Sequence, residues 1–211
     1  MTRFAGFPEA ALDFYDDLET ENTRSFWAAH KDVYETSVKA PMVALVAALE
    51  PEFGTGKVFR PYRDVRYAKD KTPYKTHQGA FVERGASAGW YVQVDPRGVM
   101  VEVGFYHAAS EQLGRFRDAV ADDRVGGELE QLLAELTGSG WVLKGDRLKT
   151  TPRGYDAAHR RIGLLRHKTL SVTKSYGFEP VIHTAALLDL VRADWHAGRP
   201  LIEWLAGNGV S

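Results

Sequence analysis

The 211-residue sequence predicts an α+β fold, with an antiparallel or mixed β-sheet and helices packed mainly on one face. Two observations lead to this prediction. Segments with helical periodicity are interspersed with segments in which apolar and polar residues alternate. The clearest strands are joined by a tight turn, which connects antiparallel neighbours, whereas parallel strands need a long crossover. No repeat, low-complexity tract or linker divides the chain, so residues 1–211 are expected to form a single α+β domain.

The N-terminal quarter predicts amphipathic helices. Apolar residues recur at helical spacing over residues 7–18, and Pro8 suits the first turn of a helix. A second helix is expected to begin after Asn22 or Thr23, since either side chain can cap it. Pro41 should kink or restart this helix, because proline has no backbone N–H to donate.

An alternating pattern follows. Residues 57–62 and 79–84 predict strands on either side of a basic loop. The clearest element covers residues 90–106, where an Asp-Pro-Arg-Gly turn at 95–98 joins two strands that share one wholly apolar face. The polar face of this hairpin carries Tyr91, Gln93, Glu102 and Tyr106.

The C-terminal half predicts further helices and short strands. Helices are expected at residues 110–122, with Ser110 as the cap, and at 128–136, 157–166 and 183–196, the last ending at Gly198. A short hairpin is expected between residues 141–143 and 147–150, and a strand at 169–174.

Several classes of protein are excluded or disfavoured by composition. Cysteine is absent, which excludes disulfides, thiolate metal sites and cysteine nucleophiles. The N-terminus has no apolar signal segment, and no run approaches the ~20 apolar residues of a membrane span. We therefore expect a cytoplasmic protein without a membrane partner. No metal site is expected, because the spacing of His159 and His167 would separate them around and along a helix.

Charge is strongly segregated, although the formal net charge is only -1. Residues 60–75 hold six basic and two acidic side chains, a net of +4, and residues 144–174 hold nine and two, a net of +7. Subtracting this +11 from -1 leaves -12 for the remaining residues. An ordinary solvated surface would intersperse the two signs, so the basic segments call for an explanation.

The first basic segment, RPYRDVRYAKDKTPYKTH at residues 60–77, is suited to bind an anion. Arginine can grip phosphate or carboxylate with two hydrogen bonds, lysine adds a point charge, and tyrosine can stack or donate. Asp64 and Asp70 are too few to neutralise the segment, so the missing charge must come from distant acidic residues or from a ligand. The candidate ligand-binding residues here are Arg60, Arg63, Arg66, Lys69, Lys71, Tyr74, Lys75 and His77.

The second basic segment supplies the other candidates. On the helix expected at residues 157–166, Ile162 and Leu165 must face the core, so Arg160 and Arg161 point in different directions. If the two segments meet in space, their field is focused into one cleft. The candidate anion-binding residues of this segment are Arg153, Arg161, Arg166, His167 and Lys168.

Strings along nearly the whole chain resemble a widespread bacterial and fungal family known as domain of unknown function 2461. The most specific of them is RDVRYAKDKTPYKT, within FRPYRDVRYAKDKTPYKTHQGA; the others are FxGFPEAALDFYDDLETENTRSFWAAHKDVYE, KAPMVALVAALEPEFG, LKTTPRGYDAAHRRIGLLRHK and PLIEWL. The resemblance implies a single-domain protein of this kind. It implies no activity, substrate or catalytic residue.

Three functions are compatible with these patterns. The first is a pocket for a small phosphorylated or otherwise anionic ligand, either a binding site or an active site. The second is nucleic-acid binding, with exposed rings stacking on bases; the candidate rings are Tyr62, Tyr67, Tyr74 and Trp90. The third is a structural or protein-interaction module in which an internal salt-bridge lattice holds the basic loop.

Catalysis would need a group that transfers protons. The candidates are His77, His107, His159, His167, Asp70 and Glu102. They form no recognisable triad, and no phosphate-binding or dinucleotide-binding glycine motif accompanies them. The catalytic residues, the cofactor and the oligomeric state therefore stay open.

Overall fold

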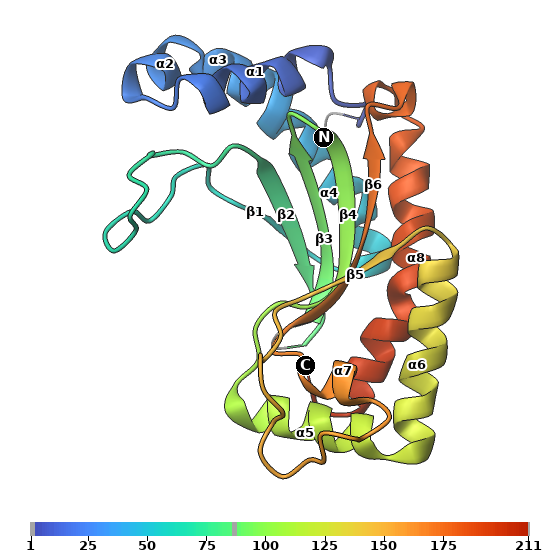
Figure 1. Cartoon of the computed structure of the whole chain (residues 1–211). Coiled ribbons are helices and arrows are strands. Elements are labelled where there is room, and N and C mark those ends of the chain that lie inside the picture. The colour runs from blue at the N-terminus through green and yellow to red at the C-terminus, as the bar shows by residue number, and fades with distance from the viewer. Residues whose placement is uncertain (1–2, 86–87, 211) are drawn as a thin grey trace. The chain divides into compact units, whose positions relative to one another are not determined.

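The computed structural model describes residues 3–85 and 88–210 and confirms the α+β class (Figure 1). Six strands form one open antiparallel sheet in the order β1-β2-β3-β4-β6-β5, and helices pack against it. The chain divides into two compact units. Unit 1 is Met1–Val82, Tyr91–Val101 and Ser175–Ala193, and unit 2 is Glu83–Trp90, Glu102–Lys174 and Asp194–Ser211. That the whole chain folds as a single domain stays a prediction.

The N-terminal helices of unit 1 are α1 (Glu9–Thr20), α2 (Arg24–Ala29), α3 (Lys31–Val33), the π-helix η1 (Tyr34–Lys39) and α4 (Ala40–Phe53). Thr23 caps α2 as predicted, since its Oγ1 accepts a hydrogen bond of 3.1 Å from the backbone N–H of Phe26. The π-helix η1 ends at Lys39 and α4 restarts at Ala40, with Pro41 in the first turn, where a missing backbone N–H costs no helical hydrogen bond.

Aromatic rings join these helices into the core of unit 1. The ring centroid of Phe14 on α1 lies 5.7 Å from that of Trp27 and 5.9 Å from that of Tyr34. Phe14, Trp27 and Tyr34 are all buried. Such edge and tilted contacts each contribute about 1 kcal/mol beyond the area they bury.

The first four strands are β1 (Gly56–Val58), β2 (Gln78–Glu83), β3 (Ala88–Asp95) and β4 (Gly98–Phe105). The hairpin of β3 and β4 is confirmed, and the predicted apolar side chains, such as Val92 and Val101, are buried. β1 is shorter than predicted. Pro61 has no N–H for a regular ladder, so beyond Val58 only isolated backbone hydrogen bonds continue the pairing.

The remaining elements are α5 (Ser110–Ala121), α6 (Asp123–Gly138), β5 (Val142–Lys144), α7 (Ile162–Leu165), β6 (Leu170–Gly177), η2 (Pro180–His183) and α8 (Leu187–Gly207). Ala109, rather than Ser110, is the N-cap of α5, and its N–H donates to Oε1 of Gln112. The helix predicted at 128–136 begins earlier, because the side chain of Asp122 caps α6 by accepting from two backbone N–H groups.

The hairpin and the helix end predicted for this half were wrong. Residues 141–143 do not form a hairpin with 147–150; instead β5 pairs with β6, with Val142 opposite Thr173. Gly198 does not end the last helix, which runs on through Pro200. Glycine at this position allows close packing, since a Cβ there would lie 2.7 Å from a methyl group of Val103. Among the described residues, no helix is long and apolar enough to cross a membrane.

Candidate functional site

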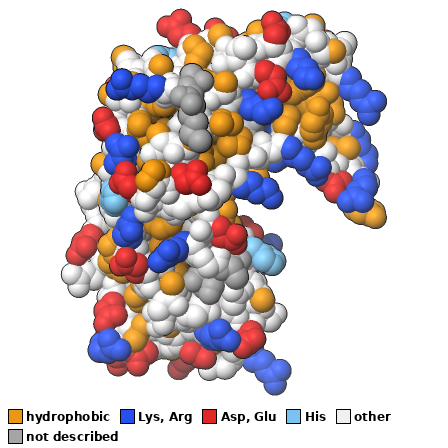
Figure 2. Space-filling view, turned by 180° about the vertical axis from the view of Figure 1, so that it is seen from behind, with side chains coloured by type: hydrophobic (Ala, Val, Ile, Leu, Met, Phe, Trp, Pro, Cys, Tyr) orange, Lys and Arg blue, Asp and Glu red, His pale blue; other side chains and the backbone are white. Residues whose placement is uncertain are grey.

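The first basic segment forms a loop that is closed by a short backbone ladder in unit 1. Arg63 N–H donates to Pro73 O at 2.9 Å, and Lys75 N–H donates to Pro61 O at 2.8 Å. The side chain of Asn22 clamps the loop at Tyr74, accepting from its N–H and donating to its carbonyl. Figure 2 shows Lys and Arg side chains gathered along this loop. The loop is therefore anchored at its base.

Three cations of the loop have partners inside it. Arg63 pairs with Asp70 and with the hydroxyl of Thr72, and Arg66 grips Asp64 through two hydrogen bonds of 3.0 and 2.7 Å. Lys71 donates to the carbonyl of Val65 at 2.9 Å. Arg63, Arg66 and Lys71 thus form contacts within the loop, of the kind expected if an internal salt-bridge lattice holds it.

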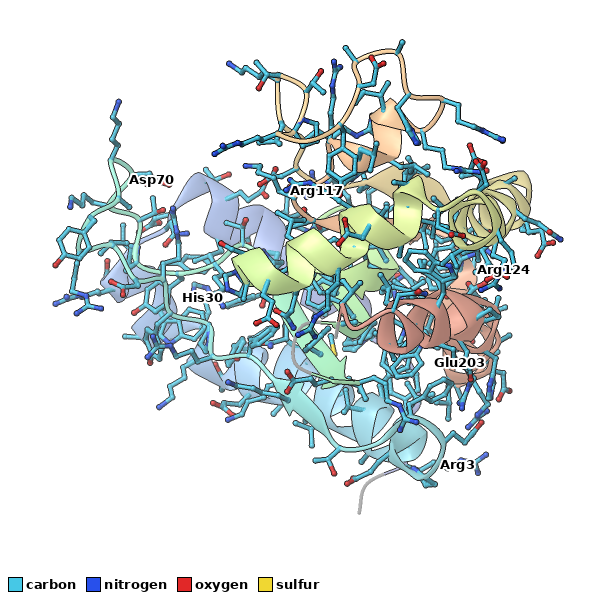
Figure 3. The ribbon with its side chains drawn as sticks, turned by 90° about the horizontal axis from the view of Figure 1, so that it is seen from below. Arg3, His30, Asp70, Arg117, Arg124 and Glu203 are labelled. Carbon is cyan, nitrogen blue, oxygen red and sulfur yellow. The ribbon has the colours of Figure 1, made fainter. Side chains whose placement is uncertain are left out.

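Asp70 belongs to this lattice and lies within the loop at the edge of the view in Figure 3. Hydrogen bonds from the backbone and side chain of Thr72, together with Arg63, lower the pKa of its carboxyl to about 2. Asp70 is therefore ionised at neutral pH, which suits a structural anion and not a proton donor.

Tyr74 and Lys69 have opposite environments. The ring of Tyr74 is buried and stacks on Trp27, with centroids 4.2 Å apart and an interplanar angle of 9°. It therefore fixes the loop to the helices. Lys69 is exposed and, within the part of the chain that the structure describes, makes no hydrogen bond or ion pair.

Lys75 lies beside the sheet, above the ring of Phe59. Its Nζ is 5.3 Å from the ring centroid, and Nζ of Lys57 is 6.0 Å from the same centroid. The ring of Tyr91, on β3, lies 6.4 Å from that of Phe59. Lys75 is half-buried, and over the described residues its ammonium has no hydrogen bond or carboxylate partner. Burial, and then the nearby charge of Arg60, lower the pKa of Lys75.

His77 extends this group of cations. It is half-buried, and its pKa is lowered by burial first and then by the charge of Lys75, although Asp95 acts in the opposite direction. The carboxylate of Asp95 already has other partners, because it accepts hydrogen bonds from Arg97 at 2.8 Å and from Gln93 at 2.9 Å. We call Lys57, Phe59, Lys75, His77 and Tyr91 the Lys75 cluster.

The Lys75 cluster combines positive charge with an aromatic floor. Tyr91 is held in place because its hydroxyl donates to Oε1 of Gln93 at 2.8 Å. Gly79 makes room for it, since a Cβ there would lie 2.2 Å from the Tyr91 hydroxyl. Lys57 and Phe59 were not among the predicted site residues. The signal for them was present, because both lie on one face of the strand expected at 57–62.

In unit 2, the side chain of Arg161 is fully buried, and each of its three guanidinium nitrogens donates a hydrogen bond. Its Nε donates to Glu130 at 2.8 Å, and its terminal nitrogens donate to the carbonyls of Asp122 at 3.2 Å and Asp123 at 3.0 Å. The carbonyl of Asp122 lies just beyond the end of α5, and Asp123 begins α6. Arg161 therefore ties the junction of the two helices together and has no donor directed at solvent.

The neighbours of Arg161 differ from one another. His167 is buried, with Nδ1 2.7 Å from the carbonyl of Thr169, and burial lowers its pKa. Nζ of Lys168 lies 3.8 Å from Oδ2 of Asp146. Arg166 is half-buried and Arg153 exposed, and in residues 3–85 and 88–210 neither has an ion-pair partner. That this segment lies next to the first basic segment stays a prediction.

Arg117 supports the fold of the second basic segment. It extends from α5 toward the segment that holds α7 (Figure 3), and its Nε donates to the carbonyl of Leu165 at 3.1 Å. The helix predicted at 157–166 is reduced to the single turn of α7. Much of this segment is therefore held by side-chain contacts with α5 and α6.

Comparison with known proteins places the chain in a family. Residues 10–204 match the family model described as conserved hypothetical protein, DUF2461. A comparison with curated proteins gave no match. Among the described residues, no group of three or more His, Asp or Glu side chains could hold a metal ion. Since the family model covers most of its length, the chain belongs to the DUF2461 family of conserved hypothetical proteins.

Proposed function

We propose that the protein binds a small phosphorylated or other anionic ligand at the Lys75 cluster. One observation carries the proposal: the side chain of Lys75 is half-buried, and its ammonium lies next to other cations and lacks a carboxylate partner among the described residues. A buried charge without a counter-ion is costly, and its pKa falls as a result. A bound anion would supply the missing charge.

The internal lattice accounts for some of the predicted site residues and leaves others for the ligand. Arg63, Arg66 and Lys71 hold the loop, and Arg161 holds α5 to α6. We assign Lys75 and His77 to the ligand, with Arg60 adding to the local field. Arg153, Arg166 and Lys168 join them only if the two basic segments converge. A cytoplasmic location is part of the proposal; a cofactor and a catalytic step are not.

A second candidate, nucleic-acid binding, is favoured by one side chain. Tyr67 is 96% exposed in the basic loop, where it is free to stack on a base beside Lys69. The other proposed stacking rings fit less well, because Tyr74 and Trp90 are buried.

A thermal-shift comparison separates the two candidates. We expect phosphate and sulfate to raise the melting temperature, and the affinity to fall only modestly when chloride is increased. Single-stranded oligonucleotides should give little stabilisation and a steep dependence on salt, because they bind through many phosphate contacts. Stabilisation by oligonucleotides alone would overturn the proposal and support the second candidate.

Sulfate affinity should rise as the pH falls from the pKa of His77 in the complex to its lower pKa in the free protein. In the free protein, burial and the charge of Lys75 lower the pKa of His77. A bound anion offsets that repulsion and raises the pKa, so the complex holds more protons than the free protein between the two values. Calorimetric titration with sulfate, whose own charge stays constant, measures the effect. His77→Gln should remove the pH dependence; an unchanged pH profile would exclude His77 from the site.

A further inference from the structure

A hollow of about 380 Å³ lies in unit 1 between the helices and the beginning of the basic loop, and it shares Phe59 with the Lys75 cluster. One wall comes from α2, α3, η1 and α4, and the other from β1 and the residues that follow it. Rings and aliphatic side chains make up much of its lining, notably Trp27, Tyr34, Val43, Val58 and Tyr62. A volume of this size lies within the range of small-molecule sites in proteins.

The rim of this hollow exposes apolar surface that the fold does not cover. Val43 is 48% exposed and Tyr62 is 50% exposed, and both belong to the few large apolar side chains of the described residues that are open to solvent. The ring of Tyr62 lies 6.1 Å from that of Trp27, so an exposed ring continues the buried aromatic core outward. Exposed apolar surface beside a concavity is typical of a ligand site.

Positive charge lies at the same rim. Lys31 and Arg60 line the hollow, and in the described parts of the chain neither side chain makes a hydrogen bond or an ion pair. Lys39 and Glu35 also line it, and their charges pair with each other at 2.7 Å. Two cations without counter-ions therefore stand beside an aromatic wall.

We propose that this hollow binds an aromatic anion, a planar ring that carries one carboxylate or phosphate group. The ring packs against the exposed ring of Tyr62 and the exposed side chain of Val43, and the anionic group lies between Arg60 and Lys31. The site does not use Lys75. The two sites share Phe59 and Arg60, so substitutions at Lys75 are what separate this inference from the phosphate-binding function proposed above.

Titration calorimetry with three carboxylates tests this inference. We expect 2-naphthoate to bind saturably and about fivefold more tightly than cyclohexanecarboxylate, which has the same charge but no aromatic ring. Acetate should bind more weakly than either. Equal affinity for 2-naphthoate and cyclohexanecarboxylate, or no saturable binding of 2-naphthoate, would overturn the proposal.

Two substitutions at one exposed position locate the binding. Val43→Glu should weaken 2-naphthoate binding about tenfold, because it places a negative charge at the rim, whereas Val43→Lys should weaken it far less. Leu190→Glu on α8 is the matched control, since Leu190 is also exposed, does not line the hollow and should leave the affinity unchanged. Lys75→Met should change the affinity for 2-naphthoate only slightly, because Lys75 itself does not line the hollow.

The outcomes of these variants separate the two sites. Equal affinity in the Val43→Glu and Val43→Lys proteins, each with a melting temperature near that of the wild type, would contradict the assignment of the hollow. Loss of 2-naphthoate binding in Lys75→Met would also contradict it, since the ring would then occupy the Lys75 cluster. A failure of phosphate to bind, with 2-naphthoate binding intact, would refute only the proposed function.

Discussion

Replacing Lys75 by methionine is expected to abolish the stabilisation of the protein by phosphate. The free protein should be at least as stable as the wild type. Methionine keeps the length and the apolar contact with Phe59, but it removes an ammonium that is half-buried and repelled by Arg60. Thermal unfolding with and without phosphate measures both effects. We expect phosphate affinity to fall at least about tenfold, as truncation of a buried charge contact commonly does.

Lys69→Met provides the matched control for Lys75→Met. Lys69 lies in the same basic loop and carries the same charge, but it is exposed and has no contact with Phe59. The substitution lowers the net charge by the same amount. It should weaken phosphate binding only slightly, because salt screens the attraction between Lys69 and a distant anion. Equal losses in the two variants would mean that phosphate responds to the overall field of the loop, and the Lys75 cluster would lose its special role.

Arg161→Met is expected to lower the free energy of unfolding by about 2 kcal/mol or more, because hydrogen bonds to a charged group are each worth about 1.5–3 kcal/mol. The substitution leaves the carbonyls of Asp122 and Asp123 without their buried donor. It also removes the 2.8 Å contact with Glu130. Denaturant unfolding monitored by circular dichroism measures the change.

Arg160→Met is the control for this prediction. Arg160 precedes Arg161 in the chain and also contacts Glu130, at 3.2 Å, but its side chain is 66% exposed. Exposed ion pairs typically contribute 0–1 kcal/mol, so the variant should unfold close to the wild type. Similar stabilities of the two variants would contradict the role of Arg161 at the α5–α6 junction. If the Arg161→Met protein still binds phosphate, this agrees with a role of Arg161 in stabilising the fold and not in binding the ligand.

Local sequence patterns predicted the local elements of the fold well. The hairpin of β3 and β4 follows from alternation and a four-residue turn, and the cap of α2 follows from Thr23. The pairing of β5 with β6 was missed because it joins residues about thirty positions apart, beyond the reach of a periodicity argument. The length of α8 was missed for a related reason, since Gly198 is required by contact with Val103 and not by the end of a helix.

The candidate site could be predicted in part. Composition drew attention to residues 60–77, but it could not tell which cations already had partners. Arg63 and Asp70 are close in sequence, so their pairing was within reach, whereas Arg161 meets Glu130 from 31 positions away. Which lysine lacks a counter-ion depends on the folded geometry. Lys75 and Lys69 look alike in the sequence, and only the structure places Lys75 on Phe59.

Amide chemical shifts measured during a phosphate titration, at constant ionic strength, test the anion site most directly. We predict saturable shifts at residues 57–60, 75–77 and 91–97, with one common dissociation constant. The tip of the loop at residues 66–70 should move little. Shifts that fail to saturate, or that leave Lys75 and His77 unchanged while the rest of the loop responds, would contradict the account.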